Sequence, residues 1–398
     1  MIQAASLDEL RAALAAPYEG KLDPRRKSHY VKMGPTAMEC VYSAKKVAWV
    51  MDWSEHRVLR PVTREAIPGF KKPNIDKDHL VMRGPSAKGP GEELDLLRGL
   101  AVEMVSPEAI NTTGLKPKIA DIVRQCLAEQ SGVFNLARVT DKVTYLVMCT
   151  LLGIEDPYLL SDEHMRMFFR WLDEFSLTPP LLLKPQFDMN QFFWDYIETR
   201  LSVALDMPVD RLLRSERLVD IQKLGMLFFL FLSGTQTSSF AIAMAYALMR
   251  THLDPAEYDA WRVKLLGPNW FREGFAIYSE SGRFYGSGLG RPHRVRWPMW
   301  LAGRPLLPYM FVYACWTSAN RDPLWIGQDP DVFRPGRRPL PGKPWFTFGR
   351  GSRRCPGQDL STAVATEFLH QLMELNPELL QASIPPGEYL RWDQLLVG

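Results

Sequence analysis

Hydrophobic and polar positions follow a helical period over the middle of the chain. Between residues 93 and 250, apolar side chains return every three to four positions, which predicts amphipathic helices. The predicted helices are Glu93–Val105, Pro117–Glu129, Val139–Leu152, Glu163–Phe175, Asn190–Leu205 and Asp220–Arg250. Residues 255–283 continue the pattern, and a further helix is expected over Gln358–Leu375. The chain should therefore be mainly α-helical.

The flanking segments are less regular. Residues 1–70 mix short helical and strand-like pieces such as Val47–Met51, and residues 71–92 are rich in Lys, Pro and Gly, as in a loop. Strands are expected at Arg294–Trp297 and Leu307–Val312, before a meander at Asp329–Pro344. Because no linker interrupts the chain, we predict one domain. Its parts are a β-containing region at about 1–70, a helical body at about 93–283, strands, meander and loop at about 284–357, and a C-terminal helix with strands at 358–398.

One hydrophobic run, Leu224–Met249, has no charged residue and is long enough to span a bilayer. Its centre, Ser233–Ser239, consists of small or polar residues, which fit poorly in lipid. They fit a long helix buried in a soluble protein, with a polar stretch beside a ligand. The N-terminal residues Met1–Arg11 lack the positive start and apolar core of a signal peptide. We expect a cytoplasmic protein without a membrane span.

Composition and cysteine usage agree with this expectation. Of the 398 residues, 46% are hydrophobic and 23% charged, as in an ordinary soluble globular protein, and the net charge of +3 does not point to nucleic acid. The five cysteines are an odd number without the close spacing of a zinc site, so a disulfide framework is not expected. Four of them are expected to be small core residues: Cys40, Cys126, Cys149 and Cys315.

The fifth cysteine, Cys355, has a different setting. It stands within Phe348-Gly349-Arg350-Gly351-Ser352-Arg353-Arg354-Cys355-Pro356-Gly357, just before the predicted helix Gln358–Leu375. Amide N–H groups and the dipole at a helix N-terminus favour a thiolate over a thiol. The glycines would let the backbone approach a large flat ligand, and Arg353 could meet an anion at its edge. The alternative is an ordinary buried cysteine before a helix.

The spacing of these residues resembles the heme-binding loop of the cytochrome P450 family, Phe-x-x-Gly-x-Arg-x-Cys-x-Gly, at every fixed position. The resemblance implies a mainly α cytochrome P450 fold, a large helical domain with small antiparallel sheets around a buried heme. It implies that the cofactor is heme b (iron protoporphyrin IX). Cys355 would be the axial thiolate, which favours O–O cleavage. The cofactor would be bound by the loop residues Phe348, Gly349, Arg353 and Gly357.

Further positions match the family from about Glu93 onward. Glu280 and Arg283 match its Glu-x-x-Arg pair, which implies a structural anchor for the heme loop. In the family an arginine of the meander often completes this network. That position falls on Val332 here, and either Arg334 or Arg337 could substitute.

Two more arginines match family residues that bind the heme propionates. Arg291 follows a glycine-rich segment, and Arg98 matches the arginine of a His-x-x-x-Arg helix. The histidine of that motif is Leu94 here, so one propionate hydrogen bond should be missing or supplied elsewhere. Buried anions need several donors, so Arg98 and Arg291 together with Arg353 make chemical sense.

The segment Ser233–Ser238 resembles the helix above the heme in the family. Gly234 and Thr237 match its pattern, which implies that Thr237 contacts iron-bound oxygen and a water. The acid of the pattern is replaced by Gln236, which can hold a water but cannot titrate near neutral pH. Either a water chain tolerates the replacement or the reaction is changed. Protons would then arrive slowly, from the substrate or with hydrogen peroxide, or aromatic groups would be coupled.

The resemblance also places the substrate and the redox partner. Substrate contacts correspond to about Lys71–Glu92, Met165–Gln191 and Phe284–Gly290, and the aromatics of the middle segment are either core or pocket wall. The stretch from Arg334 to Arg354 has seven basic residues and no acid, which suits docking of an acidic ferredoxin or flavodoxin. Nucleic acid is not an expected partner.

Taken together, the residues indicate a soluble cytochrome P450 monooxygenase or oxidase of the short bacterial type. It would activate O2 to hydroxylate or oxidatively cross-link an aromatic natural-product or peptide intermediate. Two alternatives stay open: a peroxygenase driven by hydrogen peroxide, and a non-enzymatic heme-containing ligand-binding or scaffold protein.

Overall fold

A computed structural model describes most of the helical body and parts of the remaining chain. The described residues are 2–3, 28–33, 36–41, 43–55, 59–61, 92–112, 114–155, 160–166, 168–169, 208–285, 290–295, 297–301, 304–308, 310–351, 354–383 and 394–398.

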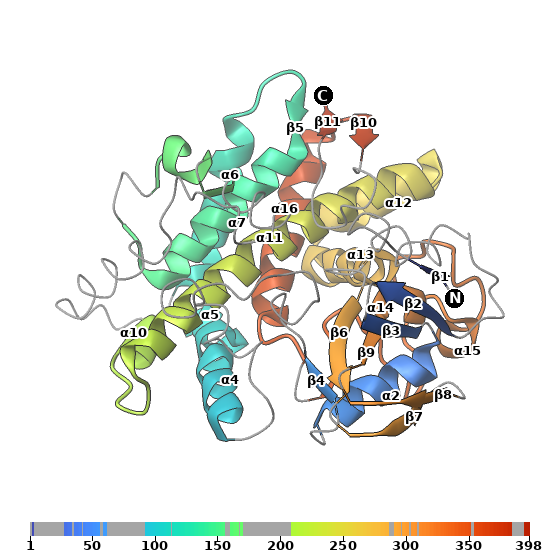
Figure 1. Ribbon diagram of the computed structural model, residues 1–398. Helices are drawn as coiled ribbons and strands as arrows, with labels where there is room; N and C mark the ends of the chain where they lie inside the picture. The colour runs from blue at the N-terminus through green and yellow to red at the C-terminus, as the bar shows by residue number, and fades with distance from the viewer. Residues whose placement is uncertain are drawn as a thin grey trace.

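Four helices form the centre of the fold. The longest, α11 (Asp220–His252), packs along α7 (Leu136–Leu152), and α13 (Trp270–Tyr285) and α16 (Gln358–Leu375) pack on it as well (Figure 1). The other helices are α2 (Ala44–Glu55), α4 (Glu92–Val105), α5 (Pro107–Thr112), α6 (Leu115–Ala128), α10 (Pro208–Leu213), α12 (Pro255–Leu266), α14 (Trp316–Ala319) and α15 (Pro323–Ile326).

Local sequence explains where the central helices begin and end. The Asn135 side chain accepts from the Ala137 N–H at the start of α7, and Gly153 ends that helix with φ = 67°. Asp254 caps α12 in a reciprocal capping box with Glu257. Asn376 ends α16 in the left-handed conformation, with φ = 46°. These signals lie at element ends, so they set helix length independently of packing.

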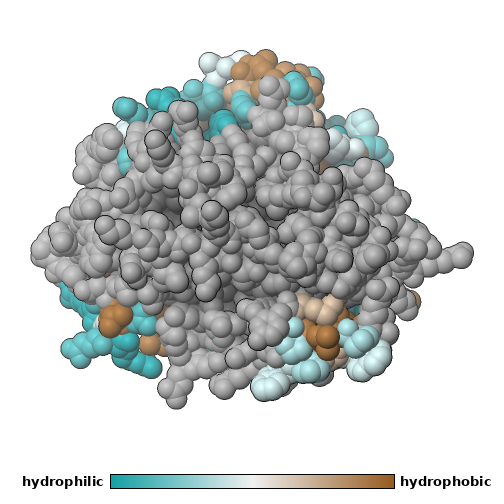
Figure 2. Space-filling view, in the orientation of Figure 1, coloured by the Kyte–Doolittle hydropathy of each residue, from teal (hydrophilic) through white to brown (hydrophobic). Residues whose placement is uncertain are grey.

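The strands form a larger mixed sheet and two small antiparallel ones. The six-stranded sheet has the order β1-β2-β3-β9-β6-β4, with β3 parallel to β9 and β6 antiparallel to β9. The strands are β1 (Ile2–Gln3), β2 (Ser28–Met33), β3 (Thr36–Val41), β4 (Leu59–Pro61), β5 (Phe134–Asn135), β6 (Gly290–Val295), β7 (Met299–Leu301), β8 (Arg304–Leu306), β9 (Phe311–Cys315), β10 (Leu379–Ser383) and β11 (Gln394–Val397). The three-stranded sheet β10-β11-β5 lies at the top of Figure 2, where Val133 and Leu380 are exposed.

Two hydrophobic cores correspond to these layers. The larger fills the space among α4, α6, α7, α11, α13 and α16. The smaller lies between α2 and the six-stranded sheet, with Val47, Val312 and Phe346 fully buried. The described parts of the chain therefore confirm a mainly helical fold with small sheets.

Several sequence predictions need adjustment. Val47–Met51, placed among mixed short pieces, lies wholly within helix α2. The helical stretch 255–283 is two helices, because Gly267 interrupts it. The predicted helix Asn190–Leu205 and most of the two outer substrate-contact segments lie outside the described residues.

The aromatic middle segment is described only at its start. Phe168 and Phe169 are buried, and both rings pack near Tyr145, with Phe168 also against Phe231. These two aromatics are therefore core residues rather than a pocket wall. Cys126, Cys149 and Cys315 are likewise buried, as expected, while the Cys40 side chain lies outside the described part.

The helix α11 deserves comparison with a membrane span. Within the described residues, Gly225–His252 is the one helical stretch long and apolar enough to cross a bilayer. The core helix of a soluble protein passes the same test, and α11 packs against α7, α13 and α16. Ala243, Tyr246 and Met249 are fully buried in that packing. Its apolar composition is thus explained by neighbouring helices.

Candidate active site

A buried ion pair on α13 anchors the segment that leads to Cys355. The side chains of Glu280 and Arg283 are both fully buried. Arg283 donates from Nε and Nη2 to the Glu280 carboxylate at 2.9 and 2.7 Å, a bidentate geometry. Its remaining N–H groups reach the carbonyls of Asn320, Pro330 and Val332 at 3.1, 2.6 and 3.1 Å. Satisfied donors are what allow such a pair to stay buried.

The third member of this network is Arg337. Its Nε donates to Glu280 Oε1 at 3.3 Å, and its other nitrogens donate to the carbonyls of Gln328, Asp329 and Val332 at 2.8 to 3.0 Å. Arg334 contributes only its backbone N–H to Glu280, at 2.9 Å, and its exposed side chain pairs with Asp329. Of the two candidates from the sequence, Arg337 occupies the position.

The anchor reaches the cysteine loop through close contacts. A Cβ at Gly282 would lie 2.2 Å from the Thr347 methyl carbon, so only glycine lets α13 approach so closely. Asn320, whose carbonyl binds Arg283, accepts the Phe346 N–H on its side-chain oxygen at 2.7 Å. Residues 346 and 347 are therefore held in place directly before Phe348.

The loop from Phe348 to Cys355 closes on itself. The Cys355 N–H donates to the Phe348 carbonyl at 2.7 Å, and the Gly349 N–H donates to the Phe346 carbonyl at 3.0 Å. Gly349 and Gly351 have φ of 73° and 61°, a conformation that favours glycine. Gly357 then caps α16. The result is a thiol presented just before a helix N-terminus.

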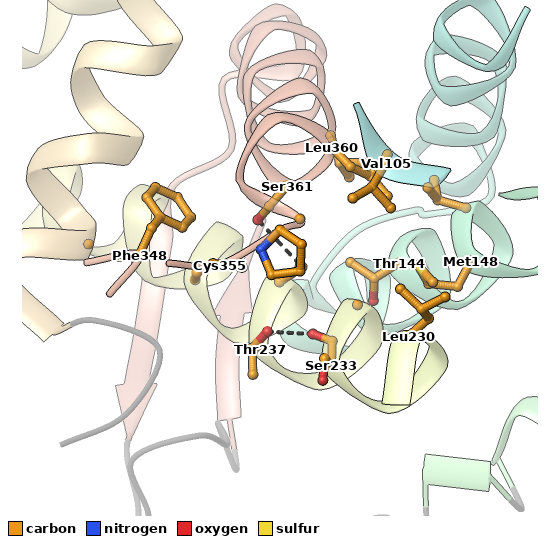
Figure 3. Close-up of a pocket in the computed structure, with 18 of the residues that line it drawn as sticks. Val105, Thr144, Met148, Leu230, Ser233, Thr237, Phe348, Cys355, Leu360 and Ser361 are labelled. Carbon is orange, nitrogen blue, oxygen red and sulfur yellow. Dashed lines mark hydrogen bonds between the residues drawn. The ribbon is translucent and has the colours of Figure 1, made fainter. Parts of the chain in front are cut away.

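Cys355 faces a cavity between the central helices (Figure 3). The cavity encloses about 920 Å³, part of it open to solvent, within the range of ligand pockets. It brings together Cys355, Phe348 and Gly357 from the loop with Gly234 and Thr237 from α11. The other lining residues are Val105, Thr144, Val147, Met148, Phe229, Leu230, Ser233, Ser238, Ala241, Tyr278, Gly282, Thr347, Pro356, Leu360, Ser361 and Val364.

The turn of α11 above Cys355 is tightly packed. A Cβ at Gly234 would lie 2.4 Å from the Met148 sulfur, so this glycine lets α7 approach α11. The Thr237 hydroxyl donates to the Ser233 carbonyl at 2.5 Å (Figure 3). Gln236 is half-buried in the same turn, and its side chain is not among those that line the cavity.

Two opposing effects act on the Cys355 thiol. Its side chain is exposed toward the cavity but enclosed by protein on its other sides, and this burial raises the pKa of Cys355. The Gly357 N–H and the Arg98 and Arg354 guanidinium groups lower that pKa, but by less. The sequence prediction that the helix N-terminus favours a thiolate is therefore outweighed by burial. A bound metal ion would deprotonate the thiol.

The predicted propionate arginines are described only in part. Arg98, on α4, donates to the Arg354 carbonyl, and burial lowers the pKa of its guanidinium. Arg291 lies in β6 opposite Ala314, but its side chain, that of Leu94 and the whole of Arg353 lie outside the described residues. Among described residues, Arg98 is thus the one predicted propionate ligand whose side chain can be placed near the cysteine loop.

The donor set fits heme better than a bare metal ion. The described residues contain no group of three His, Cys, Asp or Glu side chains that would hold a metal ion by itself. The cavity instead has a single thiol facing mostly apolar walls. An iron ion that brings its own equatorial ligands in a flat apolar ring needs only such a thiol. The residues present therefore fit heme.

Sequence reasoning missed several lining residues. Tyr278, Ser361 and Ser238 line the cavity with their hydroxyl groups, and Thr144 and Met148 reach it from α7. Tyr278 lies two positions before Glu280, which marks its helix as close to the loop. No local pattern marks Ser361 or Met148, because their role depends on how the helices pack.

A cysteine loop and a long helix enclosing one cavity are the arrangement of the cytochrome P450 fold, and comparison with solved structures confirms that the chain has this fold. No protein-family model matches the chain. The structure of P450BioI, in complex with an acyl carrier protein ligated with hexadec-9Z-enoic acid, is similar with a TM-score of 0.79 and 17% identity, covering 98% of this chain and 100% of that one.

Two other similar proteins carry the same family name. CxnD, described as the cytochrome P450 enzyme for C–S bond formation in chuangxinmycin biosynthesis, has a TM-score of 0.76 and 21% identity, covering 97% of this chain and 93% of that one. "Cytochrome P450 85A1" of Solanum lycopersicum is 24% identical over 345 residues, which cover 76% of this chain and 71% of that protein. The resemblance predicted from the sequence is confirmed.

Proposed function

We propose that the protein is a heme-thiolate oxidoreductase of the cytochrome P450 type, with heme b bound through Cys355. The observation that carries the proposal is the pairing of Cys355 with the Gly234–Thr237 turn across one apolar cavity. Bound heme would supply oxidative chemistry at iron, with the thiolate donating electron density. The alternative of a scaffold or ligand-binding heme protein is not favoured by any feature of this cavity.

The chain's own residues would hold and orient the reacting groups. Cys355 would bind iron, while Glu280, Arg283 and Arg337 keep its loop in place. Arg98 would meet a propionate at the rim, together with Arg291 and Arg353. The Thr237 hydroxyl donates to Ser233 and has an acceptor oxygen left for a water in the cavity. The apolar walls would exclude bulk water from the reaction.

The substrate class we propose is an aromatic natural-product or peptide intermediate, which is hydroxylated or cross-linked. A structural neighbour that forms a C–S bond in natural-product biosynthesis supports bond formation as well as hydroxylation. A peroxygenase reaction is the second candidate, because Gln236 replaces a titratable acid beside Thr237.

The redox partner we propose is a small acidic protein, a ferredoxin or flavodoxin, in a cytoplasmic setting. Arg334, Arg338 and Arg354 are exposed and lie in the segment around the cysteine loop. Arg337 does not belong to this basic face, because it is buried against Glu280. Long-range attraction by the remaining arginines would steer an acidic partner to the side of Cys355.

The proposal is tested on purified protein supplied with heme. We expect the reduced carbon monoxide complex to show the red-shifted Soret band of thiolate ligation, and Cys355→Ser to abolish it. The matched control is Cys126→Ser, since Cys126 is a buried cysteine of α6 that does not line the cavity. A colourless wild-type protein, or an unchanged band in Cys355→Ser, would overturn the proposal.

A further inference from the structure

Three hydroxyl groups form a line across the wall of the cavity. The Tyr278 hydroxyl oxygen lies 2.5 Å from Ser361 Oγ, and Ser361 Oγ lies 3.3 Å from Ser238 Oγ. The residues belong to α13, α16 and α11, so they are brought together only by packing. Tyr278 is 4% and Ser238 is 9% exposed, and all three residues line the cavity. The line therefore connects three helices inside the protein.

One end of this line is attached to the cysteine loop. The Tyr278 ring lies 6.2 Å from the ring of Phe348, centroid to centroid. The Phe348 carbonyl accepts the Cys355 N–H, and α13 carries Glu280 of the loop anchor. Figure 3 shows Phe348 and Cys355 on the loop beside the start of α16, where Ser361 lies. Movement of Tyr278 is thus coupled to the segment that holds the thiol.

The other end is attached to the turn of α11 that faces Cys355. Ser238 directly follows Thr237, whose hydroxyl donates to the Ser233 carbonyl. Such back-bonding bends a helix slightly, so the shape of the turn depends on its lateral contacts. Met148 supports the turn at Gly234 from the side of α7. Ser361 supports it at Ser238 from the side of α16.

We propose that Tyr278 is a positioning residue, which acts through Ser361 and Ser238 to fix the distance of the Thr237 turn from a ligand bound opposite Cys355. This inference rests on the proposed function, because the ligand concerned is the distal ligand of heme iron. Burial raises the pKa of Tyr278 to about 12, so its phenol stays protonated and able to donate a hydrogen bond at neutral pH.

The test measures imidazole binding to the ferric, heme-loaded protein by its Soret shift. Tyr278→Phe keeps the ring on Phe348 but releases the turn, so a bulky distal ligand meets less resistance. We expect the imidazole Kd to fall about threefold to tenfold, the range for one lost hydrogen bond. Ser361→Ala should have the same effect, and the double variant no more than either single one, because the hydroxyls act as a unit. Ser361→Thr keeps a hydroxyl and should retain the wild-type Kd.

The matched control is Tyr258→Phe. Tyr258 is another buried tyrosine, on α12, and its hydroxyl contacts Asn376 Oδ1 at 3.3 Å, away from the cavity. This variant should leave the imidazole Kd unchanged. An unchanged Kd in Tyr278→Phe, or additive shifts in the double variant, would overturn the inference while the thiolate band persists. Absence of that band in the wild type would overturn the proposed function, and the inference with it.

Discussion

The Arg337 Nε atom lies 3.3 Å from Glu280 Oε1, and the two side chains are 8% and 0% exposed. Arg337 stands in an irregular segment 57 residues after Glu280, yet it completes the hydrogen bonds of a carboxylate that already binds Arg283. This contact joins the meander to α13 and so to the segment before Cys355. It makes the meander part of the support of the proposed heme site.

Arg337→Met should weaken both the fold and the retention of heme. The change removes one bond to a buried carboxylate and leaves three carbonyls without that donor. We expect a loss of about 2 kcal/mol in the free energy of unfolding, as for bonds to charged groups. Denaturant unfolding and the rate of heme transfer to apomyoglobin measure the two effects. Arg338→Met changes an exposed neighbour and should have neither effect. Equal behaviour of both variants would contradict the role of Arg337.

Gly282→Ala should destabilise the protein although alanine is the better helix former. The new Cβ would lie 2.2 Å from the Thr347 methyl carbon, and such overpacking costs about 1–3 kcal/mol. Thermal or denaturant unfolding measures this loss. Thr347→Ser removes that methyl group, so adding it to Gly282→Ala should restore most of the stability. Gly99→Ala on α4 meets no atom within 4 Å, so it should instead gain up to about 1 kcal/mol. A Gly282→Ala protein as stable as the wild type would disprove the close contact.

The cysteine loop could be predicted from sequence because its parts are close together in the chain. Phe348, Cys355 and the helix start all fall within ten residues, and Glu280 and Arg283 are one helical turn apart. The choice between Arg334 and Arg337 could not be made in this way. The two are three residues apart in an irregular segment, and only the path of the backbone decides which guanidinium turns inward.

Contacts between distant helices were beyond sequence patterns. Tyr278 and Ser361 are 83 residues apart, and neither has a local signal that predicts their contact. The pKa of Cys355 was misjudged for a related reason. The helix N-terminus is visible in sequence, whereas the burial that outweighs it depends on four helices that meet in space.

Alkaline pH should destabilise the protein partly through Tyr278. Burial raises its pKa to about 12, above the ordinary value near 10, so the unfolded chain loses the proton first. The stability is therefore intact below about pH 10 and falls as the pH rises toward about 12, by about 2–3 kcal/mol for this group. Tyr278→Phe should flatten the fall, measured by denaturant unfolding at several pH values. The same slope in the wild type and the variant would exclude this contribution.

Charge reversal on the basic face should slow the docking of an acidic redox partner. Arg338 is exposed in the basic stretch, so Arg338→Glu should lower the association rate constant for an acidic ferredoxin about threefold to tenfold at low salt. Because the attraction is screened, the difference should vanish at high ionic strength. Stopped-flow reduction of the heme measures it. Arg217→Glu changes an exposed arginine outside this stretch and should have little effect. A salt-independent loss would show that Arg338 does not act by steering.

Gln236→Glu decides how protons reach the distal side. A carboxyl group at this position of α11 can donate and recover a proton, which an amide cannot, and a positioned acid contributes about 10²-fold or more. If slow proton delivery limits the wild type, reductase-driven turnover should rise by at least about tenfold in the variant. Turnover with hydrogen peroxide should change little, since that oxidant brings its own protons. Gln236→Met, which matches the length without a proton or a water ligand, should not raise either rate. An unchanged reductase-driven rate in Gln236→Glu would show that the water chain of this protein works without the acid, and would leave the peroxide route without its main support.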